Sequence, residues 1–381
     1  MELKPGYKQT EVGLIPEDWS VEPVGGAFDV CNHLRLPISQ KVREKMAGTY
    51  PYYGPTNVQG YISEYRVEGE YALIGEDGDH FLKWRDTPMT LLVNGKFNVN
   101  NHAHLITGSK NLTAWFYYFF SHKDLTPYLT RQGAGRYKLT KKTLVSIPCA
   151  LPLLPEQRAI AAALSDIDAL IASLDKLIAK KRDMKQAAMQ QLVTGRTRLP
   201  GFSGEWRHER IRELASITTG KRNTQDKVDD GLYPFFVRSS TVERINSYSF
   251  EGEAVLTAGD GVGTGKVFHY VNGKFDFHQR VYKISDFSSD LDGYFFYLYF
   301  SNHFYDRIMS MTAKSSVDSV RLEMIANMQI PLPSSDEQNA IAAVLLDMDA
   351  EVKVLEVRRD KTKLLKQGMM QELLTGRIRL V

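Results

Sequence analysis

The chain contains an internal repeat, and this duplication restricts its fold more than any other feature of the sequence. Residues 156–162 (EQRAIAA) correspond to residues 337–343 (EQNAIAA), and the correspondence continues without a gap to the Thr-Gly-Arg triplets at 194–196 and 375–377. About half of the aligned positions are identical. Such self-similarity indicates one structural element used twice, so the fold must accommodate two copies of it.

Each copy of the repeat has the pattern of one long helix. Apolar residues recur at alternating spacings of four and three, which is the heptad seam of helices that pair along their length. The seam residues are Ile160, Leu164, Ile167, Ile171 and Leu174 in the first copy and Ile341, Leu345, Met348, Val352 and Leu355 in the second. An isolated helix cannot bury such a stripe, and a globular segment separates the two copies. We therefore expect the helices to form an antiparallel coiled coil with each other.

Capping signals mark the ends of both predicted helices. Pro155 stands in the first turn of the first copy, and Ser335 with Gln338 forms a capping-box pattern at the start of the second. Gly195 and Gly376 stand where a helix closes with a left-handed residue. The repeat therefore predicts where both helices begin and end.

The segments before the two helices predict two globular domains that resemble each other more weakly. Both contain a Tyr-Pro-aromatic segment, a strand that ends in an acidic glycine loop, and a Gly-Lys-Phe triplet. Short runs rich in Val, Ile, Tyr and Phe are typical of strands, and the aromatic runs at 115–120 and 294–300 are typical of buried helices. The sequence thus predicts an α+β fold with a pseudo-two-fold internal repeat. Its parts are a domain at 1–152, a long helix at 153–199, a second domain at 200–333 and a long helix at 334–381.

Composition excludes several classes of protein. A hydrophobic fraction of 43% and a charged fraction of 24% are typical of a soluble globular protein, and no apolar run approaches the roughly 20 residues that cross a bilayer. Cys31 and Cys149 form neither a disulfide framework nor a metal-binding spacing. We expect a cytoplasmic protein. Because the net charge is only +3, any nucleic-acid binding must depend on local basic patches.

Residues 152–160, their second copy and the two Thr-Gly-Arg triplets resemble the conserved regions of specificity subunits of type I restriction–modification systems. Residues 50–54, 74–78 and 100–104 resemble a common variant of that family's target-recognition domain. The resemblance covers essentially the whole chain, in the same order and at the same spacing.

This resemblance implies a DNA-binding subunit that has no catalytic residues of its own. In this family, two target-recognition domains each read one half of an asymmetric bipartite site on double-stranded DNA, and the paired helices set the length of the unread spacer. Two modification (methyltransferase) subunits methylate an adenine in each half, and restriction (translocase and nuclease) subunits cleave the DNA. S-adenosylmethionine, ATP and Mg²⁺ are then expected on those partners, with no cofactor on this chain and no membrane association.

Basic and amide side chains on loops are candidates for DNA contact, because Arg pairs with guanine and Asn or Gln with adenine in the major groove. Residues 125–150 carry five basic side chains and no acid, and their Gly-rich centre predicts a flexible loop. The candidates are Asn98, Asn101, His102, Arg131, Gln132, Arg136 and Lys138 in the first domain and Lys221, Arg222, Arg238, Gln279, Arg280, Lys314 and Arg321 in the second. For any single candidate, an ordinary surface role is the alternative.

Other chemistry finds little support in the sequence. Residues 261–266 (GVGTGK) do not form a phosphate-binding loop, because Asp260 stands where the first glycine is required. His102 and His104 have no third ligand at metal spacing, so no metal site is predicted. The acidic segment 75–79 predicts a turn that positions a strand end. Three alternatives stay open: a specificity subunit that serves a fused methyltransferase–nuclease, a metal-dependent nuclease, and a scaffold that binds only protein.

Overall fold

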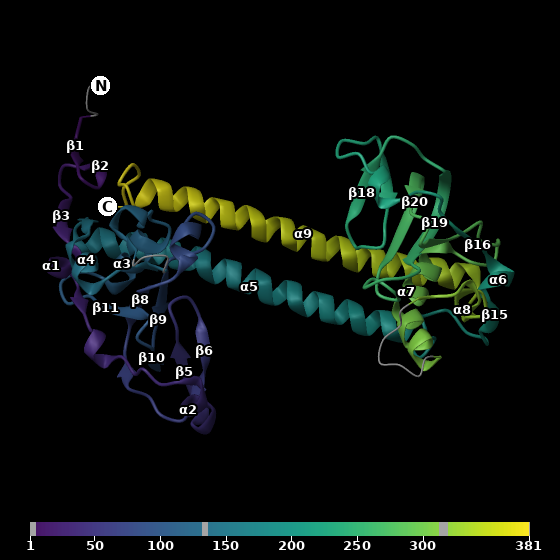
Figure 1. Ribbon diagram of the computed structural model, residues 1–381, viewed down its shortest axis with the longest axis horizontal. Helices are drawn as coiled ribbons and strands as arrows, with labels where there is room; N and C mark the ends of the chain where they lie inside the picture. The colour runs from purple at the N-terminus through teal and green to yellow at the C-terminus, as the bar shows by residue number, and fades with distance from the viewer. Residues whose placement is uncertain (1–4, 132–135, 312–318, 381) are drawn as a thin grey trace. The chain divides into compact units, whose positions relative to one another are not determined.

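The structure is a computed structural model that describes residues 5–131, 136–311 and 319–380. It divides into two compact units, of which the first comprises Met1–Leu174 with Arg358–Val381 and the second comprises Asp175–Val357. Each unit combines one globular domain with parts of two long helices (Figure 1). No helix in the described part of the chain is long and apolar enough to span a membrane.

The first domain contains two four-stranded sheets, with strand orders β6-β5-β10-β7 and β4-β11-β8-β9. Their strands are β4 (Asp29–Val30), β5 (Ala47–Tyr53), β6 (Val58–Ile62), β7 (Val67–Glu68), β8 (Tyr71–Gly75), β9 (Thr90–Val93), β10 (Lys96–Val99) and β11 (Ala103–Thr107). Two-stranded ladders join β1 (Tyr7–Thr10) to β2 (Gly13–Pro16), β3 (Ser20–Pro23) to β14 (Pro148–Leu151), and β12 (Thr130–Arg131) to β13 (Tyr137–Lys138). The helices are α1 (Val24–Ala27), α2 (Gln40–Lys45), α3 (Thr113–Ser121) and α4 (Lys141–Ser146), with 3-10 turns at Asn32–Leu34, Asp79–Lys83 and Thr126–Tyr128. Strands β5 and β10 pair in parallel.

The second domain joins the equivalent strands into one six-stranded sheet of order β16-β21-β19-β20-β17-β18. These strands are β16 (Ser216–Thr219), β17 (Tyr233–Phe236), β18 (Val242–Ile245), β19 (Phe250–Ala258), β20 (Phe268–Phe277) and β21 (Val281–Ser285). A separate ladder pairs β15 (Arg207–Arg210) with β22 (Gln329–Leu332). The helices are α6 (Ile211–Leu214), α7 (Gly293–Ser310) and α8 (Leu322–Ala326), with a 3-10 turn at Thr224–Asp226. Strands β17 and β20 pair in parallel, as β5 and β10 do in the first domain.

The aromatic runs form buried helices, as the sequence predicts. In α3, Trp115 and Phe116 are fully buried in the core of the first domain. In α7, Phe295 and Phe296 have the same role, and this helix lies against β19 and β20 (Figure 1). Their rings remove large apolar areas from water, so the core rather than an exposed stacking surface explains their aromatic content.

The two long helices are α5 (Leu154–Leu192) and α9 (Ser335–Leu373). Gly195 and Gly376 follow them with φ of +69° and +70°, which confirms the predicted left-handed ends. The predicted capping box of α9 is wrong in detail. Because the helix begins at Ser335, its cap is Ser334, whose hydroxyl oxygen accepts the backbone N–H of Glu337 at 3.4 Å. The Gln338 side chain turns to the domain instead of back to the helix.

Matching glutamines fasten the starts of these helices to their domains. The Oε1 atom of Gln157 accepts the backbone N–H of Leu112, next to α3, at 2.9 Å. The Oε1 atom of Gln338 accepts the backbone N–H of Asp292, next to α7, at 2.8 Å. Both glutamines are almost completely buried, so each aligns a long helix with the aromatic helix of its own unit.

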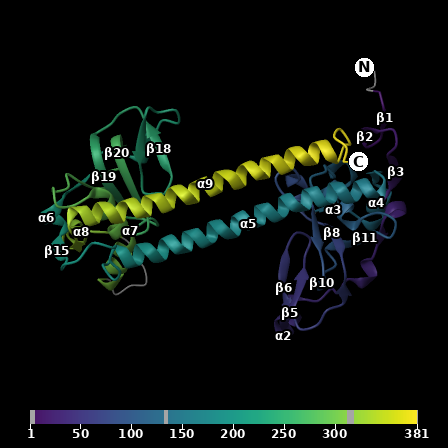
Figure 2. The same ribbon diagram turned by 180° about the vertical axis from the view of Figure 1, so that it is seen from behind.

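The long helices run antiparallel in each unit, as predicted. In the first unit, Lys366 Nζ near the end of α9 lies 2.6 Å from Asp168 Oδ1 near the start of α5. In the second unit, Lys185 Nζ near the end of α5 lies 2.5 Å from Asp349 Oδ1 near the start of α9. Within each unit the two helix segments lie side by side in both views (Figures 1 and 2). The same ion pair therefore recurs at equivalent positions in both units.

The predicted seam residues contact the domains as well as the partner helix. Ile160 and Leu164 belong to the core of the first domain, and Ile341 and Leu345 belong to that of the second. Farther along the helices, Leu174 and Val352 are buried, and Ile167, Ile171, Met348 and Leu355 are half-buried. The first turns of each helix are thus part of a domain core, which fixes the direction in which the helix leaves its domain.

A buried glutamate lies at the start of α5. The side chain of Glu156 is 1% exposed and accepts hydrogen bonds from Trp19 Nε1 at 3.1 Å and from Arg379 Nε at 2.6 Å. Arg379 follows α9 and also donates to both carboxylate oxygens of Asp18, at 2.9 and 2.7 Å. This hydrogen bonding by Arg379 holds the pKa of Asp18 below its usual value. The end of α9 is therefore tied to the start of α5 by charge-assisted hydrogen bonds.

The second unit repeats this arrangement with residues from the other copies of the repeat. The side chain of Glu337, at the start of α9, is 1% exposed and accepts hydrogen bonds from Trp206 Nε1 at 3.1 Å and from Arg198 Nη2 at 2.6 Å. Arg198 follows α5 and also lies over the Trp206 ring, 5.3 Å from its centroid. In both units, a residue that follows one long helix neutralises the acid that begins the other.

Replacing Arg379 with alanine should destabilise the first unit by about 3–5 kcal/mol, because it leaves the Glu156 carboxylate buried without its cation. The measurement is urea unfolding of the full chain. Arg377→Ala is the matched control, since Arg377 pairs with Glu372 at an exposed site and its loss should cost under about 0.5 kcal/mol. Equal effects of the two substitutions would show that the buried pair does not hold the unit together.

Candidate nucleic-acid interface

The two domains place the same backbone arrangement at one edge of their sheets. In the first domain, the N–H of Glu76 donates to the carbonyl of His102 at 2.7 Å, immediately after β8. In the second, the N–H of Gly259 donates to the carbonyl of Arg280 at 2.8 Å, immediately after β19. We call residues 76–78 with 98–102 the first edge and residues 259–261 with 276–280 the second edge.

Further backbone bonds confirm that the two edges are equivalent. The N–H of Asn100 donates to the carbonyl of Tyr53 at the end of β5, and the N–H of His278 donates to the carbonyl of Phe236 at the end of β17. The carbonyls of Glu76 and Gly259 each accept an N–H from the segment that follows the aromatic helix, from Leu139 and Val320, both at 2.7 Å. The backbone of each edge is held from three sides, so its side chains project from a rigid base.

A side-chain acceptor at the same position tightens each edge. The Oδ1 atom of Asn100 accepts the N–H of His102 at 2.8 Å. The Nδ1 atom of His278 accepts the N–H of Arg280 at 2.9 Å. Each acceptor lies two residues before the N–H that it binds, so different residues close the same local turn.

An aspartate at the same place in each edge binds a different partner. Asp77 Oδ2 lies 2.8 Å from Nδ1 of His102, whose side chain is 46% exposed. Asp260 binds two arginines, with Arg238 Nη1 at 2.8 Å from Oδ1 and Arg280 Nε at 3.7 Å from Oδ2. The predicted acidic turn is thus present in both domains, and its aspartate anchors cationic or polar side chains at the surface.

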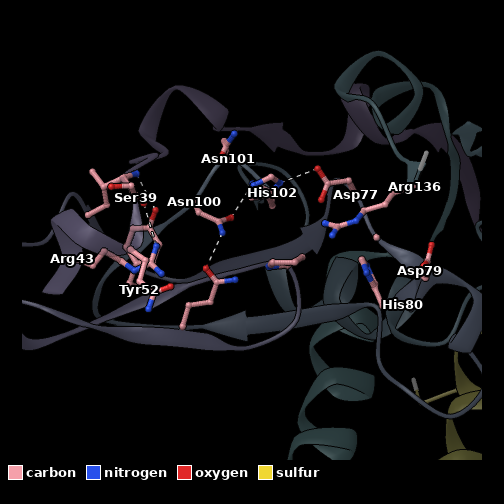
Figure 3. Close-up of a pocket in the computed structure, with 15 residues that line it drawn as sticks. Ser39, Arg43, Tyr52, Asp77, Asp79, His80, Asn100, Asn101, His102 and Arg136 are labelled. Carbon is pink, nitrogen blue, oxygen red and sulfur yellow. Dashed lines mark hydrogen bonds and ion pairs between the residues drawn. The ribbon is translucent and has the colours of Figure 1, made fainter. Parts of the chain in front are cut away.

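An open pocket of about 590 Å³ lies on the first edge (Figure 3). The view shows Asn100 and His102 in its centre, with His102 directed toward Asp77. The amide of Asn100 donates to Gln59 at 3.0 Å, and the Arg43 guanidinium lies over the Tyr52 ring, 4.8 Å from its centroid. The remaining side chains that line the pocket include Ser39, Asp79, His80, Asn101 and Arg136. The pocket offers amide, imidazole and guanidinium groups, which are the groups that read base edges and phosphates.

Beneath this pocket, the Glu76 carboxylate organises a second group of cations. Arg35 Nη1 lies 2.5 Å from Oε2 of Glu76, and Lys138 Nζ lies 3.4 Å from Oε1. Burial works to raise the pKa of Glu76, but the hydrogen bond from Arg35 and the nearby positive charges hold it below its usual value. Glu76 is therefore ionised at neutral pH, where it pairs with Arg35 and Lys138 and does not act as a proton donor.

The structure separates the predicted contacts of the first domain into different groups. Asn101, His102 and Arg136 line the pocket, whereas Lys138 pairs with Glu76. Asn98 is fully buried, and its amide donates to the carbonyl of Glu64, so its side chain is not offered at the surface.

The prediction of one flexible loop at 125–150 is wrong. Arg131 lies on β12, over the ring of Tyr137 on β13, and two of the five basic residues of the stretch, Lys141 and Lys142, begin α4. The segment forms these elements because Leu139 and Leu144 are buried core residues. Gln132 lies outside the described residues.

In the second domain, the predicted contacts fall into three places. Arg238, Gln279 and Arg280 are exposed at the second edge. Arg222 is beside them and bonds inward, to Asp276 and Ser247. Of the remaining candidates, Lys221 is exposed, and Arg321 is exposed at the start of α8. Lys314 lies outside the described residues.

Several pocket residues were missed by sequence reasoning, among them Arg43 and Gln59. Arg43 lies on the short helix α2 among residues of both charges, and Gln59 lies on β6. Nothing in their local sequence distinguishes them from surface residues. An alignment of the two domains guided by their shared Tyr-Pro segment would have placed β5 and β6 beside the edge, but not the side chains that point into the pocket.

No group of three or more His, Cys, Asp or Glu side chains in the described ranges could hold a metal ion. His104 of the His-Ala-His segment is buried and bonds to Asn32 through Nδ1 and to the carbonyl of Leu139 through Nε2. These two bonds engage both ring nitrogens in the framework of the domain.

Two buried histidines brace the edges in their neutral form. Burial lowers the pKa of His104, and burial together with the charges of Arg238 and Arg280 lowers the pKa of His278. The Nδ1 atom of His278 accepts an N–H, which requires that this nitrogen carry no proton. Protonation would therefore break a bond that shapes the second edge.

The free energy of unfolding should fall as the pH drops below about 6.5, because these histidines take up protons more readily in the unfolded chain. The full stabilisation of the folded chain by its neutral histidines is present above that pH. Below it, each histidine changes the free energy of unfolding by at most about 1.4 kcal/mol per pH unit. His278→Asn should reduce this slope and keep the edge, since Asn100 supplies the same acceptor in the first domain. Urea unfolding between pH 7.5 and 5.5 measures this slope. The substitution His208→Asn, at an exposed histidine, is the control. An unchanged slope in His278→Asn would contradict the interpretation.

Comparison with known proteins places this geometry in a family. The family model described as type I restriction modification DNA specificity domain matches twice, at residues 16–180 and 203–362. The chain is 25% identical to the type I restriction enzyme MjaVIII specificity subunit of Methanocaldococcus jannaschii, over 98% of this chain and 96% of that protein. It is 30% identical to the EcoDI specificity subunit of Escherichia coli over 45% of this chain and 37% of that protein.

Solved structures share the fold. The S subunit of a type I restriction–modification system from M. genitalium aligns with a TM-score of 0.66 and 13% identity, over 98% of both chains. A chain from a study of complex assembly and conformational transition of the type I system aligns with a TM-score of 0.56 and 16% identity, over 96% of this chain and 99% of that one. The chain therefore belongs to the type I restriction–modification DNA specificity family, as a specificity subunit that carries two copies of the family's domain.

Proposed function

We propose that each domain reads one half of an asymmetric bipartite site on double-stranded DNA and thereby directs adenine methylation and restriction by partner subunits. The two edges carry this proposal. They share one backbone arrangement and one aspartate, Asp77 or Asp260, but differ in the exposed side chains that this base presents. Two domains that present different side chains from the same backbone arrangement suit two half-sites of different sequence.

Cationic side chains at both edges support contact with DNA. The pocket on the first edge is lined by Arg43 and Arg136 together with the acids Asp77 and Asp79, whereas Arg238 and Arg280 surround a single aspartate at the second edge. Since the whole chain has a net charge of only +3, attraction to phosphates must come from such local groups. Amides beside these cations supply the donors and acceptors that distinguish one base pair from another.

The long helices support the binding of modification subunits. In the second unit, Leu177, Met184 and Val354 are exposed apolar side chains, and in the first unit Leu364 and Leu365 are exposed. Apolar side chains along a helix surface are typical of protein interfaces. We propose that modification subunits cover them and that restriction subunits join the complex through those partners.

The chemistry in this proposal belongs to the partners. We propose that this chain has no catalytic residue and no cofactor, and that S-adenosylmethionine, ATP and Mg²⁺ bind the modification and restriction subunits. A target adenine has to leave the base stack to be methylated, so the role of this chain is to hold the duplex in register for its partners.

The decisive experiment is co-expression of the chain with its modification subunit, followed by mapping of methyladenine in the host genome. A single asymmetric motif with an unread gap supports the proposal. The absence of any new methylated motif, together with Mg²⁺-dependent cleavage of DNA by the purified chain, would instead favour a nuclease. A motif that is methylated by a single fused methyltransferase–nuclease partner would identify the alternative assembly.

Asn101→Ala and Gln279→Ala should each relax one half of the motif and leave the other half unchanged, because the two side chains lie on different edges. Loss of one bidentate amide contact should cost about 1–3 kcal/mol of discrimination at one base pair. The methylated motif of each variant measures this, and each variant is the control for the other. Relaxation of the same half by both substitutions would contradict the assignment of one half to each domain.

Insertion of one helical turn into both α5 and α9 should lengthen the spacer and leave both half-sites unchanged. A turn of four residues adds about 6 Å, close to the rise of two base pairs. Insertion of four alanines into an exposed region of each helix, followed by mapping of the methylated motif, measures the effect. A spacer of unchanged length would show that the helices do not set the distance between half-sites.

A further inference from the structure

The second edge contains an exposed arginine that pairs with a carboxylate. The nearest contact between Arg280 and Asp260 joins Nε to Oδ2 at 3.7 Å, an ion pair longer than a hydrogen bond, so the two Nη atoms lie no closer than that to the acid. Its side chain is 66% exposed. Asp260 is in turn held by Arg238 Nη1 at 2.8 Å on its other oxygen. The carboxylate therefore has one arginine on each oxygen, and the pair carries one positive charge beyond what Asp260 neutralises.

The backbone of Arg280 is held by two hydrogen bonds. Its N–H donates to Nδ1 of the buried His278 at 2.9 Å, and its carbonyl accepts the N–H of Gly259 at 2.8 Å. The neighbouring Gln279 is also held, because its amide donates to Asn223 at 2.6 Å. Because the backbone that carries these donors is already ordered, it loses little conformational entropy when they bind a ligand.

We infer that Arg280 reads a guanine in the half-site of the second domain, with Asp260 as its positioning residue. This inference rests on the proposed function. The two free Nη donors match the O6 and N7 acceptors that guanine presents side by side in the major groove, and no other base presents two adjacent acceptors there. A guanidinium whose carboxylate partner lies nearest to Nε can still present both Nη donors to the edge of a base.

The first edge supports the inference by contrast. There the equivalent aspartate, Asp77, binds Nδ1 of His102, and an imidazole leaves only its single Nε2 atom for a base. Pro55 stands where the second edge has Arg238, since each follows the end of its strand by two residues. The position of the first edge that corresponds to Arg280 thus lacks the two-donor fork, and we assign the bidentate reading of guanine by this position to the second half-site.

The experiment uses the complex of the full chain with its modification subunit and a DNA duplex that carries the mapped motif. Each guanine of the second half-site is replaced in turn by 7-deazaguanine, which lacks the N7 acceptor but keeps base pairing. At one position the affinity should fall about 5- to 100-fold. Inosine at the same position lacks only the minor-groove amino group, and it should bind as guanine does.

Two variants assign this effect to the proposed residues. Arg280→Gln should abolish the difference between guanine and 7-deazaguanine at that position and leave the first half-site unchanged. Asp260→Asn should reduce the difference while raising the affinity for unrelated DNA, because it frees a positive charge and loosens the fork. Lys274→Ala removes an exposed cation from the same domain, away from the edge, and should keep the full difference.

The outcomes separate this inference from the proposed function. A mapped bipartite motif with no guanine on either strand of the second half-site would overturn the role of Arg280 and leave the proposed function standing. The same holds if Arg280→Gln weakens all sequences equally and retains the sensitivity to 7-deazaguanine, which would make Arg280 a phosphate contact. Failure of the complex to bind or methylate any motif would instead overturn the proposed function itself.

Discussion

The buried carboxylates of Glu156 and Glu337 set the constraint on which the rest of the structure depends. A carboxylate removed from water is tolerated only when cations and donors satisfy it, and here an arginine and a tryptophan do so in each unit. Because the arginine always follows the other long helix, neither domain is complete without both helices. This requirement brings the end of one long helix to the start of the other in each unit, which is the antiparallel pairing.

The sequence predicted the features that periodicity and repetition encode. The repeat gave the long helices, the left-handed glycines at 195 and 376 and the antiparallel pairing, because each has a local signature in residue type and spacing. It did not predict that Gln338 turns away from its helix to bind Asp290 and Asp292, since that choice depends on a neighbour distant in the chain. Burial of a polar side chain such as Asn98 is likewise set by tertiary packing and not by its own residue type.

The candidate interface was predictable as a region but not as a set of contacts. Glycine and acid after a strand located both edges, and most of the exposed candidates around them were found. The roles of Asp77 and Asp260 could not be read from sequence, because an acid on a turn looks the same whether it is solvated or braces a cation. Only the distances to His102, Arg238 and Arg280 distinguish these cases.

The bond between Arg379 and Glu156 also has a consequence for the newborn chain. A ribosome releases the first domain early, but the cation that neutralises its buried acid is made 223 residues after that acid. The second unit, Asp175–Val357, has all of its own residues before that moment. The domain synthesised first can thus reach its final form only after the second unit and Arg379 have been made, which inverts the usual order of folding during translation.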